Sequence, residues 1–119
     1  MPRVFVVQKQ HRWDERSQQF VPKFDLAPAE HYGELQFLLS PTAAPFNLKP
    51  ILADLHAGLA DIRSEDYLLL IGNPVLIGVA TAIALDNLSC RGDGVLNLLQ
   101  WSGKEKRYVV IEARDVFAT

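Results

Sequence analysis

The sequence has a single cysteine, Cys90, and it lacks the features of several classes of protein. One cysteine cannot form a disulfide framework within the chain, nor a zinc site made of several thiolates. Net charge is also scarce, at −2 for 119 residues, while 49% of the residues are hydrophobic. A disordered chain needs less hydrophobicity and more net charge, so the composition predicts one folded domain spanning residues 1–119.

Recognisable catalytic and metal-binding motifs are missing as well. The histidines His11, His31 and His56 are too far apart for a His-x-x-x-His or His-Glu-x-x-His pair. The sequence contains no Gly-x-Ser-x-Gly elbow, no Gly-x-Gly-x-x-Gly turn and no glycine-rich loop ending in Lys-Ser/Thr. We therefore assign no catalytic residue, no metal site and no cofactor, and we favour a non-enzymatic protein. A Cys–His nucleophile stays open as an alternative.

Long apolar runs that would enter a membrane are also lacking. The N-terminal run Val4–Val7 is shorter than the core of a secretory signal, which needs about 7–15 apolar residues. Residues 67–85 carry no charge and reach the length of a membrane helix, but Gly72, Asn73 and Pro74 interrupt them. We therefore expect a strand followed by a separate helix, and a cytoplasmic protein rather than a membrane protein.

Hydrophobic periodicity divides the chain into helices and strands. An apolar stripe at helical spacing predicts a surface helix that begins after Asn47, a suitable N-cap, and extends to Ile62. A second helix, from Pro74 to about Leu88, is apolar all round, which predicts burial on most sides. Runs rich in β-branched and aromatic residues predict strands at 3–8, 34–39, 67–71, 95–101 and 107–112, and residues 28–32 predict one helical turn.

The order of these elements predicts the fold. Strand, helix, strand, helix, strand over residues 34–101 makes two crossover units, which place parallel strands side by side. We predict a single small α/β domain with a mixed five-stranded sheet, parallel in its centre and antiparallel at its edges, and two main helices. These helices either lie on opposite faces of the sheet or leave one face for a partner subunit, so a homodimer is a further expectation.

Residues 9–24 are predicted to form an N-terminal hairpin arm. The segment is polar, but Trp13 and Phe20 flank the turn-forming residues 14–17. Long loops in compact domains are often functional, and arginine and tryptophan are favoured at binding hot spots. The candidate partner-binding residues are therefore the basic and aromatic side chains of the arm: Lys9, Arg12, Trp13, Arg16, Phe20 and Lys23.

The uneven distribution of charge supports an alternative function, nucleic-acid binding. Residues 1–23 hold five basic and two acidic side chains, whereas residues 24–93 hold three basic and nine acidic ones. A further basic cluster at 104–107 would meet the arm if the first and last strands were neighbours. Cations there would attract phosphates, and Trp13 or Trp101 could stack on bases. An isoelectric point near 5.9 argues against this alternative, because nucleic-acid-binding domains are usually basic.

The junction Gly72-Asn73-Pro74 supports a third function, binding of a nucleotide or phosphate. A glycine at the carboxyl end of a parallel strand, opening a helix, is where open α/β sheets bind ligands. Free amides and the helix dipole would suit an anion there, so Gly72 and Asn73 are candidate anion-binding residues. Pro74 removes one of the amides that a phosphate would use, which favours a tight capped turn instead.

Six segments of the chain carry a resemblance to a known family. They are Arg3–Gln8, Val21–Leu26, Tyr32–Leu35, Leu70–Gly78, Leu99–Gly103 and Arg107-Tyr108. In these segments the chain resembles a family of small accessory proteins of tailed bacteriophages, which has no settled activity. The resemblance implies a phage protein in the bacterial host cytoplasm, and it carries over no site residue. Small phage accessory proteins often bind other proteins, so the partner we expect is a host or phage protein.

Overall fold

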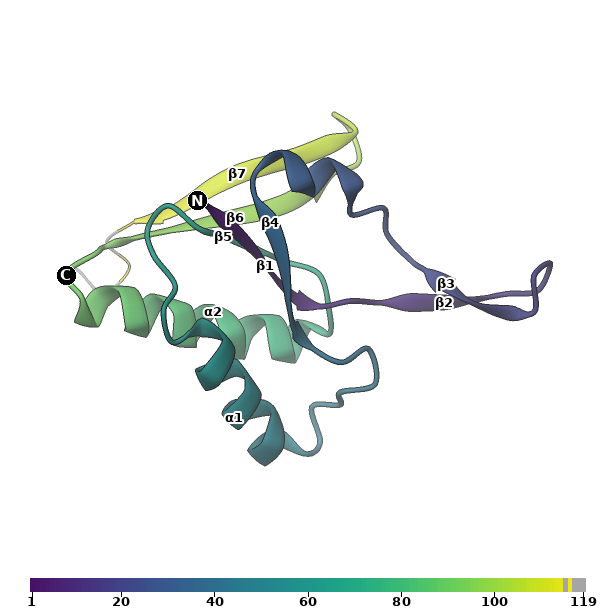
Figure 1. Cartoon of the computed structure of the whole chain (residues 1–119), viewed down its shortest axis with the longest axis horizontal. Coiled ribbons are helices and arrows are strands. Elements are labelled where there is room, and N and C mark those ends of the chain that lie inside the picture. The colour runs from purple at the N-terminus through teal and green to yellow at the C-terminus, as the bar shows by residue number, and fades with distance from the viewer. Residues whose placement is uncertain (115, 117–119) are drawn as a thin grey trace.

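The computed structural model describes residues 1–114 and 116, and its centre is one mixed five-stranded sheet (Figure 1). The strands lie in the order β4-β1-β5-β6-β7. The first four run parallel, and β7 pairs antiparallel with β6. The predicted α/β fold is confirmed, but antiparallel pairing occurs at the β7 edge alone, because the β4 edge pairs parallel with β1. The strands are β1 (Arg3–Gln8), β4 (Glu34–Leu39), β5 (Tyr67–Leu69), β6 (Val95–Ser102) and β7 (Arg107–Arg114).

The first strand, β1, lies inside the sheet, between β4 and β5. The helices α1 (Leu48–Leu59) and α2 (Pro74–Cys90) connect β4 to β5 and β5 to β6. Numbered along the chain, the five sheet strands therefore follow the order 2-1-3-4-5, a doubly wound order with its switch point between the first and third strands. In this chain the switch point lies between the carboxyl ends of β1 and β5.

Both long helices cover the same face of the sheet (Figure 1). Side chains alternate across β1, so Phe5 and Val7 point towards the helices while Val4 and Val6 point to the opposite face. The main core joins Phe5, Val7, Leu68 and Leu96 to the inward stripes of α1 and α2. This core is continuous from α1 through α2 to the sheet.

The chain itself covers part of the opposite face, and the expectation that the helices lie on opposite faces was wrong. The 3-10 helix η1 (Ala27–His31), predicted as one helical turn, places Ala29 fully inside this second core. Leu26 and Tyr32 pack against the same cluster. The prediction missed this cover because residues 26–32 show no periodic apolar pattern.

The helices differ from the prediction in capping and in burial. Asn73 caps α2 as predicted, with its Oδ1 accepting from the Val75 amide at 2.9 Å. Asn47 precedes α1 but its side chain makes no capping hydrogen bond, at a backbone φ of −128° and ψ of 77°. α2 is not buried on most sides, because the sheet and α1 contact one arc of it and leave Val75 51% exposed. Within the described residues, no helix has the length and apolar character needed to cross a membrane.

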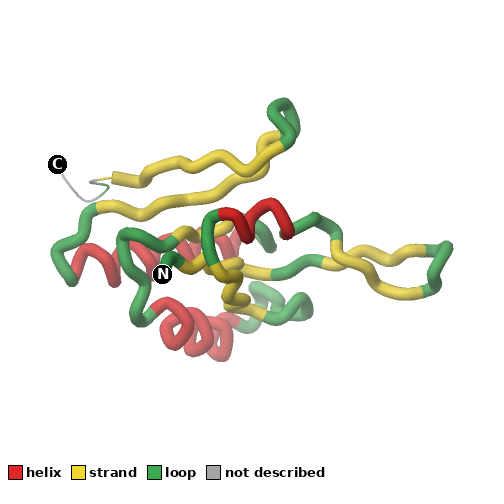
Figure 2. Tube along the Cα trace, turned by 45° about the horizontal axis from the view of Figure 1, so that its top comes forward, coloured by secondary structure: helices red, strands yellow, loops and turns green. Residues whose placement is uncertain are grey.

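The predicted hairpin arm is a separate two-stranded sheet that projects from the body (Figures 1 and 2). It consists of β2 (His11–Asp14) and β3 (Gln19–Pro22). At its base the Lys23 amide donates to the Gln10 carbonyl at 2.8 Å. Between His11 and Pro22 every residue is exposed or half-buried. The arm therefore adds nothing to either core.

Candidate functional site

The arm carries a pair of aromatic side chains on one face. Trp13 and Phe20 lie directly opposite each other in the β2–β3 register, with ring centroids 5.2 Å apart and ring planes at 73°. Trp13 is 48% exposed and Phe20 is 69% exposed. An edge-to-face pair stabilises the hairpin locally, but its outer surface stays open to solvent. We call this surface the aromatic face of the arm.

The structure brings together two of the six predicted partner-binding residues on that face, and it separates the others. Arg12 lies opposite Val21 on the other face of the hairpin, because neighbouring residues of a strand alternate. Arg16 lies in the turn at the tip. The turn is held by Asp14, whose Oδ2 accepts from the Ser17 hydroxyl at 2.8 Å. This hydrogen bond lowers the pKa of Asp14 below its ordinary value.

The two predicted lysines lie at the base of the arm, next to phenylalanine rings. Lys9 Nζ is 5.5 Å from the centre of the Phe37 ring, and Lys23 Nζ is 5.4 Å from the centre of the Phe24 ring. Both distances suit cation–π contacts. The arm thus presents an aromatic face with basic side chains at its tip, its base and its opposite side.

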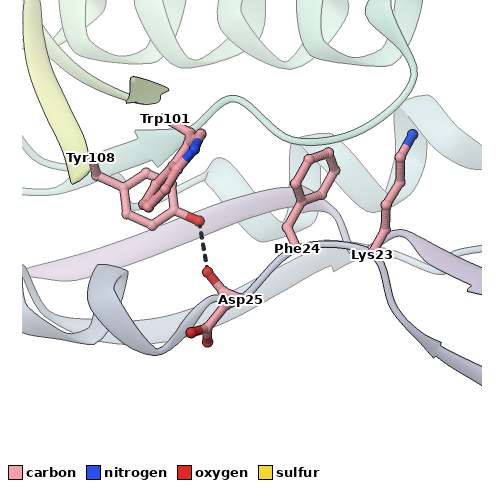
Figure 3. A pocket seen from close by; sticks show the side chains of 5 residues that line it. All are labelled: Lys23, Phe24, Asp25, Trp101 and Tyr108. Atoms are coloured by element: carbon pink, nitrogen blue, oxygen red, sulfur yellow. Dashed lines mark hydrogen bonds between the residues drawn. The ribbon is translucent and has the colours of Figure 1, made fainter. Parts of the chain in front are cut away.

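A second aromatic surface lies between the base of the arm and the β6–β7 hairpin (Figure 3). We call it the aromatic cleft, a cavity of about 200 Å³ lined by Lys23, Phe24, Asp25, Trp101 and Tyr108. Trp101 is 42% exposed and Phe24 is 37% exposed. A neighbouring cavity of about 270 Å³ shares these two rings and extends along Gln10, Leu70, Ile71, Gly72 and Gln100. The cleft therefore opens beside the carboxyl ends of β1 and β5.

Hydrogen bonds from two tyrosines fix the wall of the cleft. The Tyr108 hydroxyl donates to the Asp25 carbonyl at 3.1 Å, and the Tyr32 hydroxyl donates to the Tyr108 carbonyl at 3.2 Å. The Trp101 ring packs edge-on against Tyr108, with centroids 5.1 Å apart. Burial raises the pKa of Tyr108, and the nearby Asp25 carboxylate adds to this rise. Figure 3 shows that carboxylate turned away from Trp101 and Phe24, so the cleft walls are mainly aromatic.

Most of this cleft was not predicted from the sequence. Lys23 was predicted to bind a partner and Trp101 to stack on bases, but no binding role was predicted for Phe24 or Tyr108. The cross-strand pairing of Trp101 with Tyr108 could have been found from the last predicted hairpin. Nothing local in the sequence brings Phe24 to that hairpin, because the contact depends on the path of residues 23–33 across the sheet.

The predicted anion-binding residues lie at the switch point, where Gln8 occupies the space between the strands. Gln8 is buried, and its Oε1 accepts from the Asn73 amide at 3.0 Å. Its Nε2 donates to the carbonyls of Ser40 and Ala43 at 3.1 and 2.8 Å. A Cβ on Gly72, whose φ is 143°, would lie 2.8 Å from the Gln8 Cβ. Glycine at this position therefore lets Gln8 approach the loop closely.

These contacts leave few donors for an anion at the start of α2. Gln8 uses the Asn73 amide, the Asn73 side chain uses the Val75 amide, and Pro74 has no amide hydrogen. An anion at a helix N-terminus needs several free amides. The geometry thus favours the capped turn over a phosphate site.

Other predicted combinations of residues are not assembled. The strands β5 and β6 lie between β1 and β7, so the first and last strands of the sheet are not neighbours and the condition for joining the arm to the basic cluster at 104–107 fails. In the described part of the chain, no three His, Cys, Asp or Glu side chains are placed to hold a metal ion.

The fold and its surfaces define a class: a small doubly wound α/β domain with a projecting aromatic arm and a switch point filled by its own side chain. A family model described as "Phage Pam3 gp32-like protein" matches residues 2–114. The chain therefore belongs to this phage protein family, whose function is unknown, and the predicted resemblance to a phage family is confirmed. Comparisons with curated proteins and with solved structures gave no match.

Proposed function

We propose that this phage protein is a binding protein rather than an enzyme, and that it contacts a host or phage protein in the host cytoplasm. The aromatic face of the arm is the principal contact surface in this proposal, and the aromatic cleft is its extension. The observation that carries the proposal is the exposure of Trp13 and Phe20 on an element that contributes nothing to the core.

The energetics of exposed aromatics support this assignment. Burying a large aromatic side chain typically contributes about 1.5–3 kcal/mol, and hot spots at protein interfaces are rich in tryptophan and arginine. Trp13 and Phe20 gain little of this burial free energy on folding, because their rings pack against each other on an exposed hairpin. Arg16, in the turn at the tip, lies next to the aromatic face and is suited to the polar rim of such an interface.

The continuity of the two aromatic surfaces supports the extension to the cleft. The chain passes from β3 directly through Lys23 to Phe24, which forms part of the cleft wall. A partner segment lying along the aromatic face would therefore reach Trp101 without crossing a buried strand. Lys23 lies at the boundary and favours a partner segment that carries an acidic side chain there.

Affinity capture from host cells carrying the phage tests the proposal. We expect the tagged protein to capture one partner at constant stoichiometry, and Trp13→Ala and Phe20→Ala each to lose it. With the purified partner, each substitution should weaken binding by about 2 kcal/mol or roughly 30-fold, measured by calorimetric titration. Phe46→Ala is the matched control, since Phe46 is 96% exposed but lies in the loop before α1.

The proposal predicts the result for the wild type and for each of the three variants. The wild type and Phe46→Ala must bind equally, and the two arm variants must fail while keeping the wild-type far-ultraviolet circular dichroism. Equal capture by all four, or capture of no partner by the wild type, would refute the arm as the contact surface.

A further inference from the structure

The outer strand β7 is an open edge of the sheet beyond Tyr108, whose carbonyl accepts from the Tyr32 hydroxyl. It spans eight residues and pairs with β6 in an uninterrupted register, and no described strand lies on its other side. It contains no proline, and its run Tyr108–Ile111 carries no charged side chain, although Glu112 follows directly. Soluble proteins usually protect such an edge with a proline, a bulge, central charges or a covering segment. A partner strand would supply the protection that β7 lacks.

The main-chain groups of β7 alternate between β6 and solvent. The Leu70 amide donates to the Leu99 carbonyl at 3.0 Å, so Leu99 directs its main chain towards β5. The main-chain groups of Leu98 and Gln100 therefore face β7, where they pair with those of Ile111 and Val109. Because the direction alternates along a strand, the amides and carbonyls of Val110 and Glu112 face the free edge. These four groups can pair with another strand.

Apolar side chains flank that edge on both faces. Val110 is 44% exposed on the face that carries Trp101, and Ile111 is 43% exposed on the face that carries α2. The neighbouring Ala113 already packs partly against the main core. A strand added to the edge would cover both apolar side chains, and on the helix side it would extend the main core.

We propose that a second copy of this chain pairs antiparallel with β7, so that two five-stranded sheets join into one ten-stranded sheet. A two-fold axis perpendicular to the sheet would relate the copies and keep all four long helices on one side. A copy of β7 fits as the partner because its own apolar residues alternate between both faces at its centre. This proposal concerns a different surface from the arm and does not depend on the proposed function.

Charge selects the register of this pairing. Centred on Ile111, the register places the two Ile111 side chains opposite each other and Arg114 opposite the Tyr108 ring of the second copy. The pair Arg114–Glu112, at 3.0 Å within one chain, is retained. A register centred on Val110 would instead place Arg114 opposite Lys106 of the second copy, and these two positive charges would repel each other. The Ile111-centred register places no like charges opposite each other between residues 108 and 114.

A disulfide tests both the edge and its register. Ile111 is a non-hydrogen-bonded position in this pairing, so the two Ile111 Cα atoms would lie about 4.5 Å apart. That separation is within the range of a disulfide. In a Cys90→Ser background, we expect Ile111→Cys to give a covalent dimer under mild oxidation. Val109→Cys is the matched control, because its two copies would lie roughly 13 Å apart, four residues out of register.

The oligomeric state supplies the second measurement. Light scattering of the wild type at tens of micromolar should give the mass of a dimer. Ile111→Lys should shift it to a monomer with unchanged circular dichroism, since the two lysines would face each other and the site is partly exposed. A monomeric wild type, a larger assembly, or equal cross-linking through residues 109 and 111 would overturn the proposal.

Discussion

At the scale of single residues, two buried polar side chains connect segments that are distant in the sequence. Gln8 and Asp66 are the buried polar or charged residues of the described chain. Asp66 Oδ1 accepts from the Arg3 amide at 2.9 Å, and its Oδ2 accepts from the Arg3 guanidinium at 3.0 Å and the Arg63 amide at 2.9 Å. The carboxylate therefore joins the beginning of β1 to the loop before β5. Without it the Arg3 and Arg63 amides would lose this acceptor, and the Arg3 guanidinium would keep only Asp61.

Replacing that carboxylate should destabilise the fold strongly. We expect Asp66→Ala to lower the free energy of unfolding by about 2–3 kcal/mol, because it leaves two amides without an acceptor and removes the buried carboxylate from the Arg3 guanidinium. Urea denaturation measures the loss. Asp61→Ala is the control: Asp61 also bonds to Arg3, at 3.1 Å, but its side chain is 68% exposed, so we expect a loss of about 0.5 kcal/mol. Equal losses would contradict the role given to Asp66.

At the scale of elements, the sequence located the helices and strands because each one repeats a local pattern. The inward stripe of α1 and the proline-capped start of α2 are visible within a few turns of sequence. Ends were less predictable: the predicted strand 67–71 stops at Leu69, since the Ile71 amide turns back to the Leu69 carbonyl. Such a turn depends on two residues and leaves no periodic signal.

The arrangement of the elements could not be predicted in the same way. The place of β1 between β4 and β5 depends on pairs such as Val4 with Leu35 and Val4 with Tyr67, which are far apart in the chain. The aromatic cleft has the same origin, because Phe24 and Trp101 meet only through the folded sheet. The arm was predictable because its aromatics and turn lie within one short segment.

The arm should be removable without loss of the fold. Residues 11–22 can be replaced by Asn-Gly, which closes a two-residue turn between Gln10 and Lys23 and retains their hydrogen bond. We expect the free energy of unfolding to change by less than about 1 kcal/mol, since no residue of the segment is fully buried and loop length has a small entropic effect. Thermal unfolding followed by circular dichroism measures it. A loss of cooperative unfolding would show that the arm supports the body.

At the scale of the whole molecule, the charge distribution bears on the alternative of a nucleic-acid partner. The net charge is −2, and the basic residues of the arm are not joined to the cluster at 104–107 through neighbouring strands. Binding to nucleic acid needs several cations on one continuous surface, each releasing counterions. We therefore expect a protein rather than a nucleic acid as the partner.

Filter binding therefore should detect no nucleic-acid complex. At about 50 mM salt, where phosphate contacts are strong, we expect no retention of single- or double-stranded DNA or of RNA by micromolar protein. A basic single-strand-binding protein serves as the positive control for the filter. Retention that decreases steeply as salt increases, and that is lost in Arg12→Ala, would favour nucleic acid over a protein partner.

Gln8 has a further consequence for how this scaffold can change. In other doubly wound sheets a ligand binds at the switch point. Here the Gln8 carboxamide lies at that point and forms hydrogen bonds with the loops at Ser40–Ala43 and Gly72-Asn73. Both loops thus depend on hydrogen bonds to the same side chain, so a change in the length or sequence of one loop affects the contact with the other. Diversity in this family should accumulate where no such contact exists, in the hairpin that leaves β1 two residues later.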